Sequence, residues 1–409
     1  MLSHSCITAT IMILLHTADW HIGQTFFEYD RKAEHLQFLA WLKKQVHELN
    51  VDVLLIAGDV FDSPNPSAES QRMYYRFLRE VTTENPLLQI IIIAGNHDSA
   101  ARLEAPNPLL EEMNIAARGV VKRTDEGEID FNNLVVPFTK GGYCLAVPYL
   151  RQGDYPNAES YALGVKAMYE AMLACVKGKE GPIVAMGHLQ ATGSEISEND
   201  RSERTVIGGL ECISPDSFSL EIAYTALGHL HRAQRVSGRE NVRYAGSPLP
   251  MSFAEKKNKQ GVTLVELADT PRTATRIERI AFEAPVKLLS IPSTPLPLAD
   301  ILAEIAELPE GEISASSPYL EIKVLITQPE PSLRHQLEEA LKTKSVRLTR
   351  IVAVTPKSEG ETKAITYEEL QTIRPMDMAD AIFKRRYGGE EMPDAMKVLL
   401  NEVIREVEG

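Results

Sequence analysis

Five short runs of apolar residues along the chain each end in a group of small and polar residues. The runs begin at Ile13, Val53, Ile90, Ile183 and Tyr224. A continuous apolar run of this length, bounded by turn residues, is typical of a strand that is buried on both faces of its sheet. The pattern therefore predicts five buried strands, each with polar side chains at its carboxyl end.

Helical periodicity separates the first three of these strands. Apolar residues recur at steps of three and four between residues 36 and 49, and again through Met73, Phe77 and Val81 after a Ser-Pro-Asn-Pro-Ser segment. Strands that alternate with helices favour a parallel sheet. Because ligands of open α/β sheets bind outside the carboxyl ends of the strands, we expect the five strand ends to meet in one crevice.

The later part of the chain changes character at a proline-rich join that begins at Pro285. We predict a main domain over residues 1–283, a small α/β capping unit over 284–360 in the order strand, helix, strand, helix, strand, and a helical segment over 361–409. The last segment carries an apolar stripe for packing or for partner binding, made of Met396, Leu399, Leu400, Val403 and Val407.

Charge and composition narrow the functional classes. The 409-residue chain has a formal net charge of −14, which argues against a basic surface over the whole protein. Nucleic acid is not thereby excluded, since bound metal ions and a local basic patch can neutralise phosphates. The capping unit is locally basic, either as a DNA-facing surface or as an ordinary solvated face, through Lys323, Arg334, Lys342, Lys344, Arg347 and Arg350.

The cysteines and the hydropathy pattern favour a cytoplasmic protein. The four cysteines have no C-x-x-C spacing, so we expect reduced thiols. No run approaches the roughly 18 apolar residues that a membrane span needs, and the residues before Met12 lack a basic signal-peptide region. We therefore predict a soluble protein without a membrane partner.

The polar residues at the strand ends are of the types that bind metal ions. They are Asp19, His21, Asp59, Asn96, His188, His229 and His231. Oxygen and nitrogen donors without thiolates suit Mn, Fe or Zn. Seven donors are too many for one ion with open positions, but they fit two ions that share a bridging carboxylate and together bind a phosphoryl group. Each residue alone would more often be a turn-capping group.

Three neighbouring residues have expected roles other than metal binding. His97 follows Asn96, and imidazoles titrate near neutral pH, so we expect it to protonate a leaving oxygen or to orient a ligand. Asp62 and Asp98 are expected to fix turns or orient ligands rather than bind metal.

Together these residues resemble the five motifs of the calcineurin-like metallophosphoesterases. The motifs are Asp19-x-His21, Gly58-Asp59-x-x-Asp62, Gly95-Asn96-His97-Asp98, Gly187-His188 and Gly228-His229-x-His231. The resemblance implies an α/β fold in which two sheets form a sandwich flanked by helices, in the layer order α-β-β-α.

Within that superfamily the chain resembles the SbcD family of DNA repair nucleases, most clearly over residues 16–23, 147–151, 228–234 and 243–253. The resemblance implies two divalent ions, usually manganese, and His97 as the catalytic histidine. It places one ion on Asp19, His21, Asp59 and His231. It places the second on Asp59, Asn96, His188 and His229, so that Asp59 bridges.

The same resemblance implies the biological setting. Such nucleases act in DNA repair, recombination and replication, as exonucleases on double-stranded DNA and endonucleases on single-stranded or hairpin DNA. They are nucleoid-associated and work with an SbcC-type SMC ATPase, as a homodimer within a heterotetramer. Dimerisation would use the helices after Asp62 and Asp98. The chain has no G-x-x-x-x-G-K-[ST] motif, so any ATP dependence would come from the partner.

Two other functions remain open from the sequence. The first is a phosphatase or cyclic-nucleotide phosphodiesterase with the same site. The second is a non-catalytic scaffold for an ATPase. The capping unit and terminal helices count against the first, and the complete set of ligand types counts against the second.

Overall fold

The computed structural model describes residues 11–192, 194, 212–268, 274–326, 330–355, 375–386, 392–394, 396–397 and 399–400. The chain divides into two compact units, Met1–Val354 and Thr355–Gly409. Each unit is described by itself.

The first sheet of the larger unit has six strands in the order β14-β13-β1-β4-β5-β6. Their bounds are β14 (Ala274–Ala281), β13 (Gly261–Leu267), β1 (Met12–Thr17), β4 (Val53–Ala57), β5 (Gln89–Ile93) and β6 (Ile115–Arg118). The four strands from β1 to β6 are parallel, and β13 and β14 continue the sheet in antiparallel pairing. The predicted parallel arrangement of the first three strands is therefore confirmed.

The second sheet also has six strands, in the order β11-β12-β10-β9-β8-β7. They are β11 (Gln234–Val236), β12 (Arg239–Tyr244), β10 (Tyr224–Gly228), β9 (Ile183–His188), β8 (Tyr143–Ala146) and β7 (Val135–Pro137). The central strands β12, β10, β9 and β8 are parallel, so their carboxyl ends lie at one edge.

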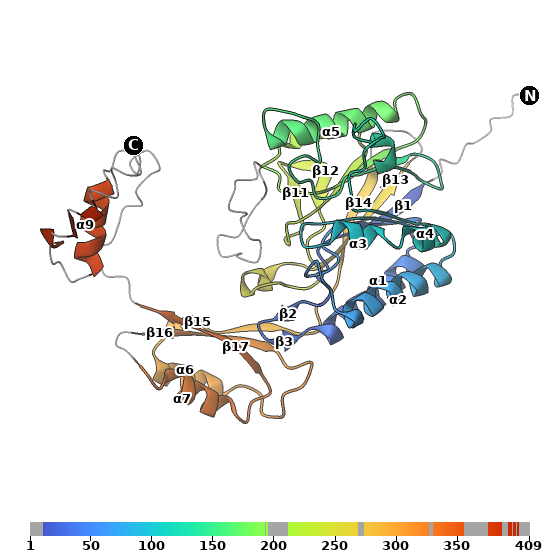
Figure 1. The fold of residues 1–409 in the computed structure, drawn as a ribbon. Coiled ribbons are helices and arrows are strands. Elements are labelled where there is room, and N and C mark those ends of the chain that lie inside the picture. The colour runs from blue at the N-terminus through green and yellow to red at the C-terminus, as the bar shows by residue number, and fades with distance from the viewer. Residues whose placement is uncertain are drawn as a thin grey trace, which may run out of the picture. The chain divides into compact units, whose positions relative to one another are not determined.

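The two sheets pack face to face and carry helices on their outer faces (Figure 1). Alternate residues of β4 show why, since Val53 and Leu55 belong to the core between the sheets and Leu54 and Ile56 face the helices. Helices α1 (Lys32–Glu48) and α2 (Ala68–Glu84) cover the first sheet. Helix α5 (Tyr161–Cys175) covers the second. These four layers confirm the predicted α-β-β-α fold.

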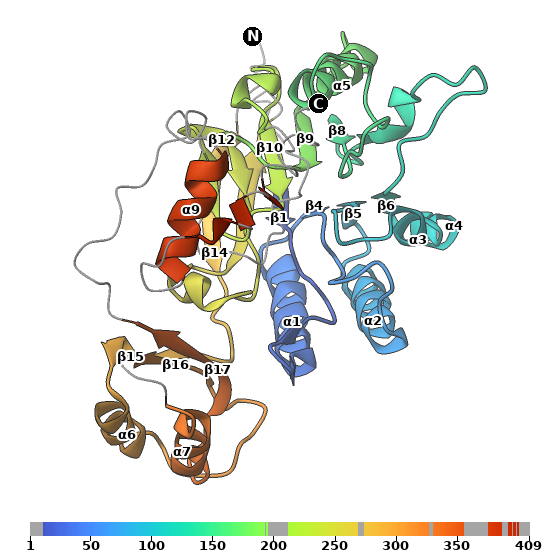
Figure 2. The ribbon, with the colours of Figure 1, turned by 60° about the vertical axis from the view of Figure 1, so that its left-hand side comes forward.

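A smaller parallel sheet follows in the chain, with two helices on one of its faces (Figure 2). Its elements are β15 (Leu288–Leu296), α6 (Leu298–Ala306), β16 (Tyr319–Leu325), α7 (Leu333–Leu341) and β17 (Arg347–Val354). The predicted order of strand, helix, strand, helix, strand is observed. This small sheet and its two helices have their own apolar core around Ile301, Ile322 and Leu337.

Shorter elements complete the described part of the chain. They are β2 (Thr25–Phe26), β3 (Tyr29–Asp30), α3 (Ala100–Glu104), α4 (Asn107–Leu110), four 3-10 turns at Glu111–Met113, Phe131–Leu134, Pro215–Ser217 and Phe253–Lys257 (η4), and, in the second unit, α9 (Pro375–Arg386). None of the helices in the described ranges has the length and apolar character to cross a membrane. Cys144, Cys175 and Cys212 are free thiols, and Cys6 lies outside the described residues.

Candidate metal centre

The five predicted strand ends converge where the two sheets meet. Strands β1, β4 and β5 bring Asp19, His21, Asp59 and Asn96 from the first sheet, and β9 and β10 bring His188, His229 and His231 from the second. Glycines allow this close approach. A Cβ atom at Gly95 would overlap the Asp59 carboxylate, and one at Gly58 would overlap the His188 ring. The convergence expected from the sequence is thus observed for all seven residues.

Asp59 lies at the centre of the cluster. Its Oδ2 atom is 3.7 Å from His21 Nε2 and 3.3 Å from His188 Nε2, while its Oδ1 atom accepts the backbone N–H of His97 at 2.8 Å. Asp59 Oδ2 and His21 Nε2 are buried and have no hydrogen-bond partner within the described part of the chain. Buried polar atoms are nearly always satisfied, so these atoms indicate a missing ligand.

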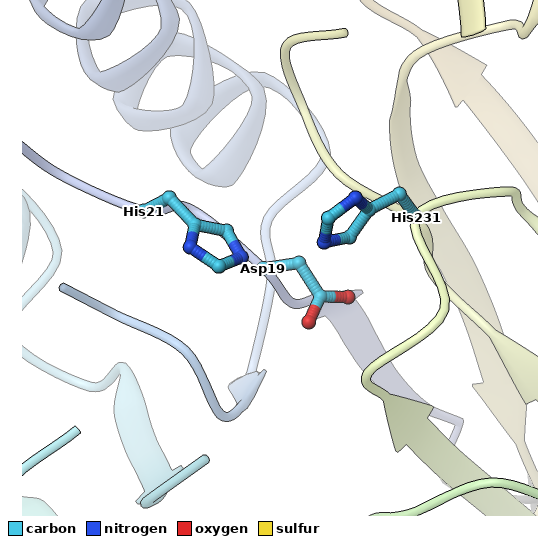
Figure 3. A group of neighbouring side chains, drawn as sticks. All are labelled: Asp19, His21 and His231. Carbon is cyan, nitrogen blue, oxygen red and sulfur yellow. The ribbon is translucent and has the colours of Figure 1, made fainter. Parts of the chain in front are cut away.

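A first group of donors consists of Asp19, His21 and His231 (Figure 3). One ligand atom from each lies within 4.8 Å of the others, and all three side chains are buried. Asp19 Oδ1 accepts the backbone N–H of His229 at 2.9 Å, and Asp19 Oδ2 has no partner among the described residues. This second oxygen is therefore available to the same ligand as the histidine nitrogens.

A second group surrounds the side-chain oxygen of Asn96. Asn96 Oδ1 lies 2.9 Å from His188 Nε2 and 3.0 Å from His229 Nδ1. His188 Nδ1 donates to the Ala57 carbonyl at 2.9 Å, which leaves the Nε2 lone pair of a neutral ring directed at Asn96 and Asp59. A cation among these donors would hold them together without a proton.

Backbone strain is concentrated at the same residues. Asp19, His21, Asp59 and His229 have φ values of 55°, 47°, 50° and 100°, in the left-handed region that non-glycine residues seldom adopt. Each such residue costs on the order of 1–3 kcal/mol and persists where the surrounding structure enforces it. Strain of this kind collects at functional sites.

Burial and mutual charge shift the titration of the cluster in the metal-free protein. Burial raises the pKa of Asp19 to about 6. Burial opposes the charge on Asp59 too, but the nearby imidazoles of His188 and His21 hold its pKa well below the usual range. Burial likewise opposes a charge on His188, yet the Asp59 and Asp19 carboxylates raise its pKa to about 10. Without metal, the proton on His188 balances the ionised Asp59 carboxylate, and a divalent cation would supply the same positive charge.

Comparison with known proteins identifies the family. Residues 12–233 match the model of the calcineurin-like phosphoesterases, and residues 265–390 match that of the type 5 capsule protein repressor C-terminal domain. The chain is 37% identical to the SbcD subunit of the SbcCD nuclease of Rhodobacter capsulatus over 85% of this chain and 88% of that protein. The chain belongs to the SbcD family. It is 27% identical to the SbcD subunit of Escherichia coli K12 over 96% of this chain and 97% of that protein.

His97 lies at the edge of the cluster of this SbcD-family chain. Its Nδ1 atom donates to the Asp62 carbonyl oxygen at 2.9 Å, so a neutral ring carries its lone pair on Nε2. The ring centroid is 4.8 Å from that of His21. A ring nitrogen of His97, a ring nitrogen of His21 and a carboxylate oxygen of Asp59 lie within 4.8 Å of one another. The His97 side chain is half-buried.

Two further carboxylates, Asp98 and Asp62, lie beside the cluster. Asp98 accepts the backbone N–H groups of Val60, Phe61 and Gly95 at 3.2, 3.0 and 2.9 Å, and so joins the turns after β4 and β5. Asp62 Oδ1 lies 3.3 Å from His21 Nδ1, behind the ring as seen from Asp59. Neither carboxylate belongs to the two donor groups.

Other residues near the motifs are part of the core. Trp20 is fully buried and packs edge-on against Phe38 and Phe77. His16 is buried between the sheets with its Nδ1 2.9 Å from the Tyr224 hydroxyl. His35 is buried on α1.

One residue beside the donor groups was missed by the sequence reasoning. Glu255 is buried on η4, with Oε1 3.3 Å from His231 Nδ1. It lies two positions beyond the stretch 243–253 that resembles the family. A lone glutamate on a short turn has no periodic signal, so only its nearness to that stretch could have marked it.

Proposed function

We propose that this chain is a two-metal-dependent DNA nuclease of the SbcD family. The observation that carries the proposal is the position of Asp59 Oδ2, which lies between His21 Nε2 of the first donor group and His188 Nε2 of the second. One carboxylate oxygen is thus within reach of both groups. A shared carboxylate supports a pair of neighbouring ions that act together on a phosphoryl group.

The ligands divide between the two groups. The first ion would be held by Asp19, His21, Asp59 and His231, and the second by Asp59, Asn96, His188 and His229. The donors are carboxylate, amide and imidazole, which fit manganese as the working metal. When bound, the two ions supply an activated water and stabilise the charge that develops on the phosphoryl group.

His97 would act on the leaving oxygen of the scissile ester. Its Nδ1–H bond to the Asp62 carbonyl fixes the ring, so that the imidazolium form of His97 would carry on Nε2 the proton that passes to the leaving oxygen, and the ring would return to the neutral form. The ring is half-buried beside His21, so the substrate can reach it from solvent. General acid catalysis of this kind contributes typically 10²–10⁴-fold to a rate.

The case for DNA as the substrate comes from family membership, since the relatives are named as the SbcD subunit of the SbcCD nuclease. The six basic residues of the capping unit give only weak support for DNA binding, because all six are buried or paired with glutamates. Lys344 and Arg347 are buried, and Arg350 and Lys323 both pair with Glu321. Arg334 and Lys342 pair with glutamates of the same region.

The proposed partner is an SbcC-type SMC ATPase, in keeping with the relatives' names. The second unit offers apolar side chains for it. On α9, Met378 and Ile382 are exposed one turn apart, and farther along Met396 and Leu399 are 50% and 65% exposed. Val403 and Val407 of the predicted stripe lie outside the described residues. A homodimer through α2 and the helices after Asp98, and a cytoplasmic location at the nucleoid, belong to the same proposal.

The test uses the purified full-length protein, alone and with its SbcC-type partner, in manganese. Labelled linear and hairpin DNA are offered beside p-nitrophenyl phosphate esters, and Asp59→Asn protein from the same purification controls for contaminating nucleases. We expect DNA cleavage that depends on metal and on Asp59. Rapid turnover of the small esters without DNA cleavage would establish the phosphatase alternative, and no hydrolysis of any substrate would favour a scaffold.

A further inference from the structure

The first donor group differs from the second in what lies behind its histidines. His231 Nδ1 is 3.3 Å from Glu255 Oε1, and His21 Nδ1 is 3.3 Å from Asp62 Oδ1. In the second group, the Nδ1 atom of His188 instead donates to a backbone carbonyl. Of the two carboxylates, Glu255 is the more enclosed, since its side chain is 2% exposed and that of Asp62 is 38% exposed.

We propose that Glu255 is the positioning residue that orients His231 for the first metal ion, an inference that rests on the proposed two-metal site. A carboxylate accepts and never donates when ionised, so it fixes the proton of a neutral His231 ring on Nδ1. The lone pair is then on Nε2, the atom on the far side of the ring. Partners of this kind also increase the basicity of the liganding nitrogen.

The chemistry of the second oxygen explains why a carboxylate is needed. Glu255 Oε2 accepts the backbone N–H of Met251 at 3.0 Å, so each of its two oxygens faces a donor. Glutamine has nearly the same shape but only one acceptor oxygen. Its NH₂ group would face either the Met251 N–H or His231 Nδ1, and the second arrangement would favour a proton on His231 Nε2, where the ion should bind.

The segment that carries Glu255 is held in place by a buried ionic network. Arg31 is fully buried, donates to the Pro250 carbonyl at 2.8 Å and pairs with Glu34 at 2.9 Å. From the small sheet, the hydroxyl of Tyr319 donates to Glu34 at 2.7 Å. The turn that carries Glu255 is therefore fixed at Pro250 by a buried side chain that is itself held by Glu34 and Tyr319.

The test is manganese binding to Glu255→Gln protein, followed by calorimetry and by the electron paramagnetic resonance spectrum of the coupled ion pair. We expect the affinity for one of two ions to fall about 10- to 100-fold, as is usual when a partner of a metal-bound histidine is lost, with the other ion retained. The coupled-pair spectrum should become that of a single ion at low manganese. Glu240→Gln, which changes an exposed glutamate, is the matched control and should bind both ions as the wild type does.

The outcomes separate the two proposals. Wild-type protein that binds a single ion would overturn the two-metal site, whatever Glu255 does. Wild-type protein with two ions, together with Glu255→Gln and Glu255→Ala variants that both keep the same two affinities and spectrum, would overturn the positioning role alone.

A second measurement does not depend on the variant's folding. In zinc-loaded wild-type protein with ¹⁵N-labelled histidine, long-range ¹H–¹⁵N spectra report which ring nitrogen of His231 carries the proton. The His231 signal is assigned by its absence from His231→Gln protein. We expect the proton on Nδ1, facing Glu255, and a proton on Nε2 would overturn the proposal.

Discussion

The Asp98 carboxylate offers a direct test of how the metal-centre turns are held. It accepts two backbone N–H groups, those of Val60 and Gly95, on Oδ2 and a third, that of Phe61, on Oδ1. In Asp98→Asn the amide oxygen can keep the first pair, but the NH₂ group then faces the Phe61 N–H. A buried donor left unsatisfied costs about 1–3 kcal/mol. We therefore expect the variant to lose roughly 2 kcal/mol of unfolding free energy.

Urea unfolding of the metal-free protein measures this loss, because removing the ions separates stability from binding. The matched control is Asp154→Asn, whose carboxylate accepts a single backbone N–H, that of Arg151, near the surface. The control should change stability by less than about 0.5 kcal/mol. An Asp98→Asn variant as stable as the control would refute the view that Asp98 joins the turns after β4 and β5.

Three further predictions concern the cluster and its surroundings. Asp59→Asn should weaken both ions together by at least about tenfold, as measured by calorimetry, and loss of only one ion would contradict bridging. His97→Ala should keep both ions and lose about 10²–10⁴-fold in DNA cleavage, and loss of metal would instead make His97 structural. Burial and the Arg279 charge lower the pKa of His16 from 6.5 to about 3, so the unfolded chain binds the extra proton below pH 6.5. Protonation of His16 in the unfolded chain should thus lower the unfolding free energy of the metal-free wild type by roughly 2 kcal/mol between pH 6.5 and 5. In His16→Gln that part of the fall should be absent from denaturation curves. Equal pH dependence in the two proteins would contradict this prediction.

The fold and the cluster could be predicted because the residues that determine each strand and its following turn are close together in the sequence. A buried strand such as Val53–Ala57 needs apolar side chains on both faces, and the turn that follows it needs residues that tolerate unusual backbone angles. These demands leave a short pattern at each strand end. Parallel pairing of the strands then places their carboxyl ends at one edge of each sheet.

The features that escaped prediction depend on contacts between distant segments. Glu255 contacts His231 across 24 positions, and Glu321 reaches Arg350 on the neighbouring strand across 29. Among the basic residues of the capping unit, Arg334 and Lys342 pair with glutamates three or four positions away, whereas Arg350 pairs with Glu321 on the neighbouring strand. Charge counted along a sequence therefore overstates the charge that a folded surface presents.

The left-handed turns of the cluster join its chemistry to its backbone. Aspartate, asparagine and histidine are the non-glycine residues that enter this region most readily, and they are also oxygen and nitrogen ligands for metals. Asp59 and His229 thus meet a conformational demand and a chemical one with the same side chain. For this reason Asp59→Asn is a sharper probe than Asp59→Ala. Asparagine removes the charge and tolerates a φ of 50°, whereas alanine would add backbone strain to the loss of the carboxylate.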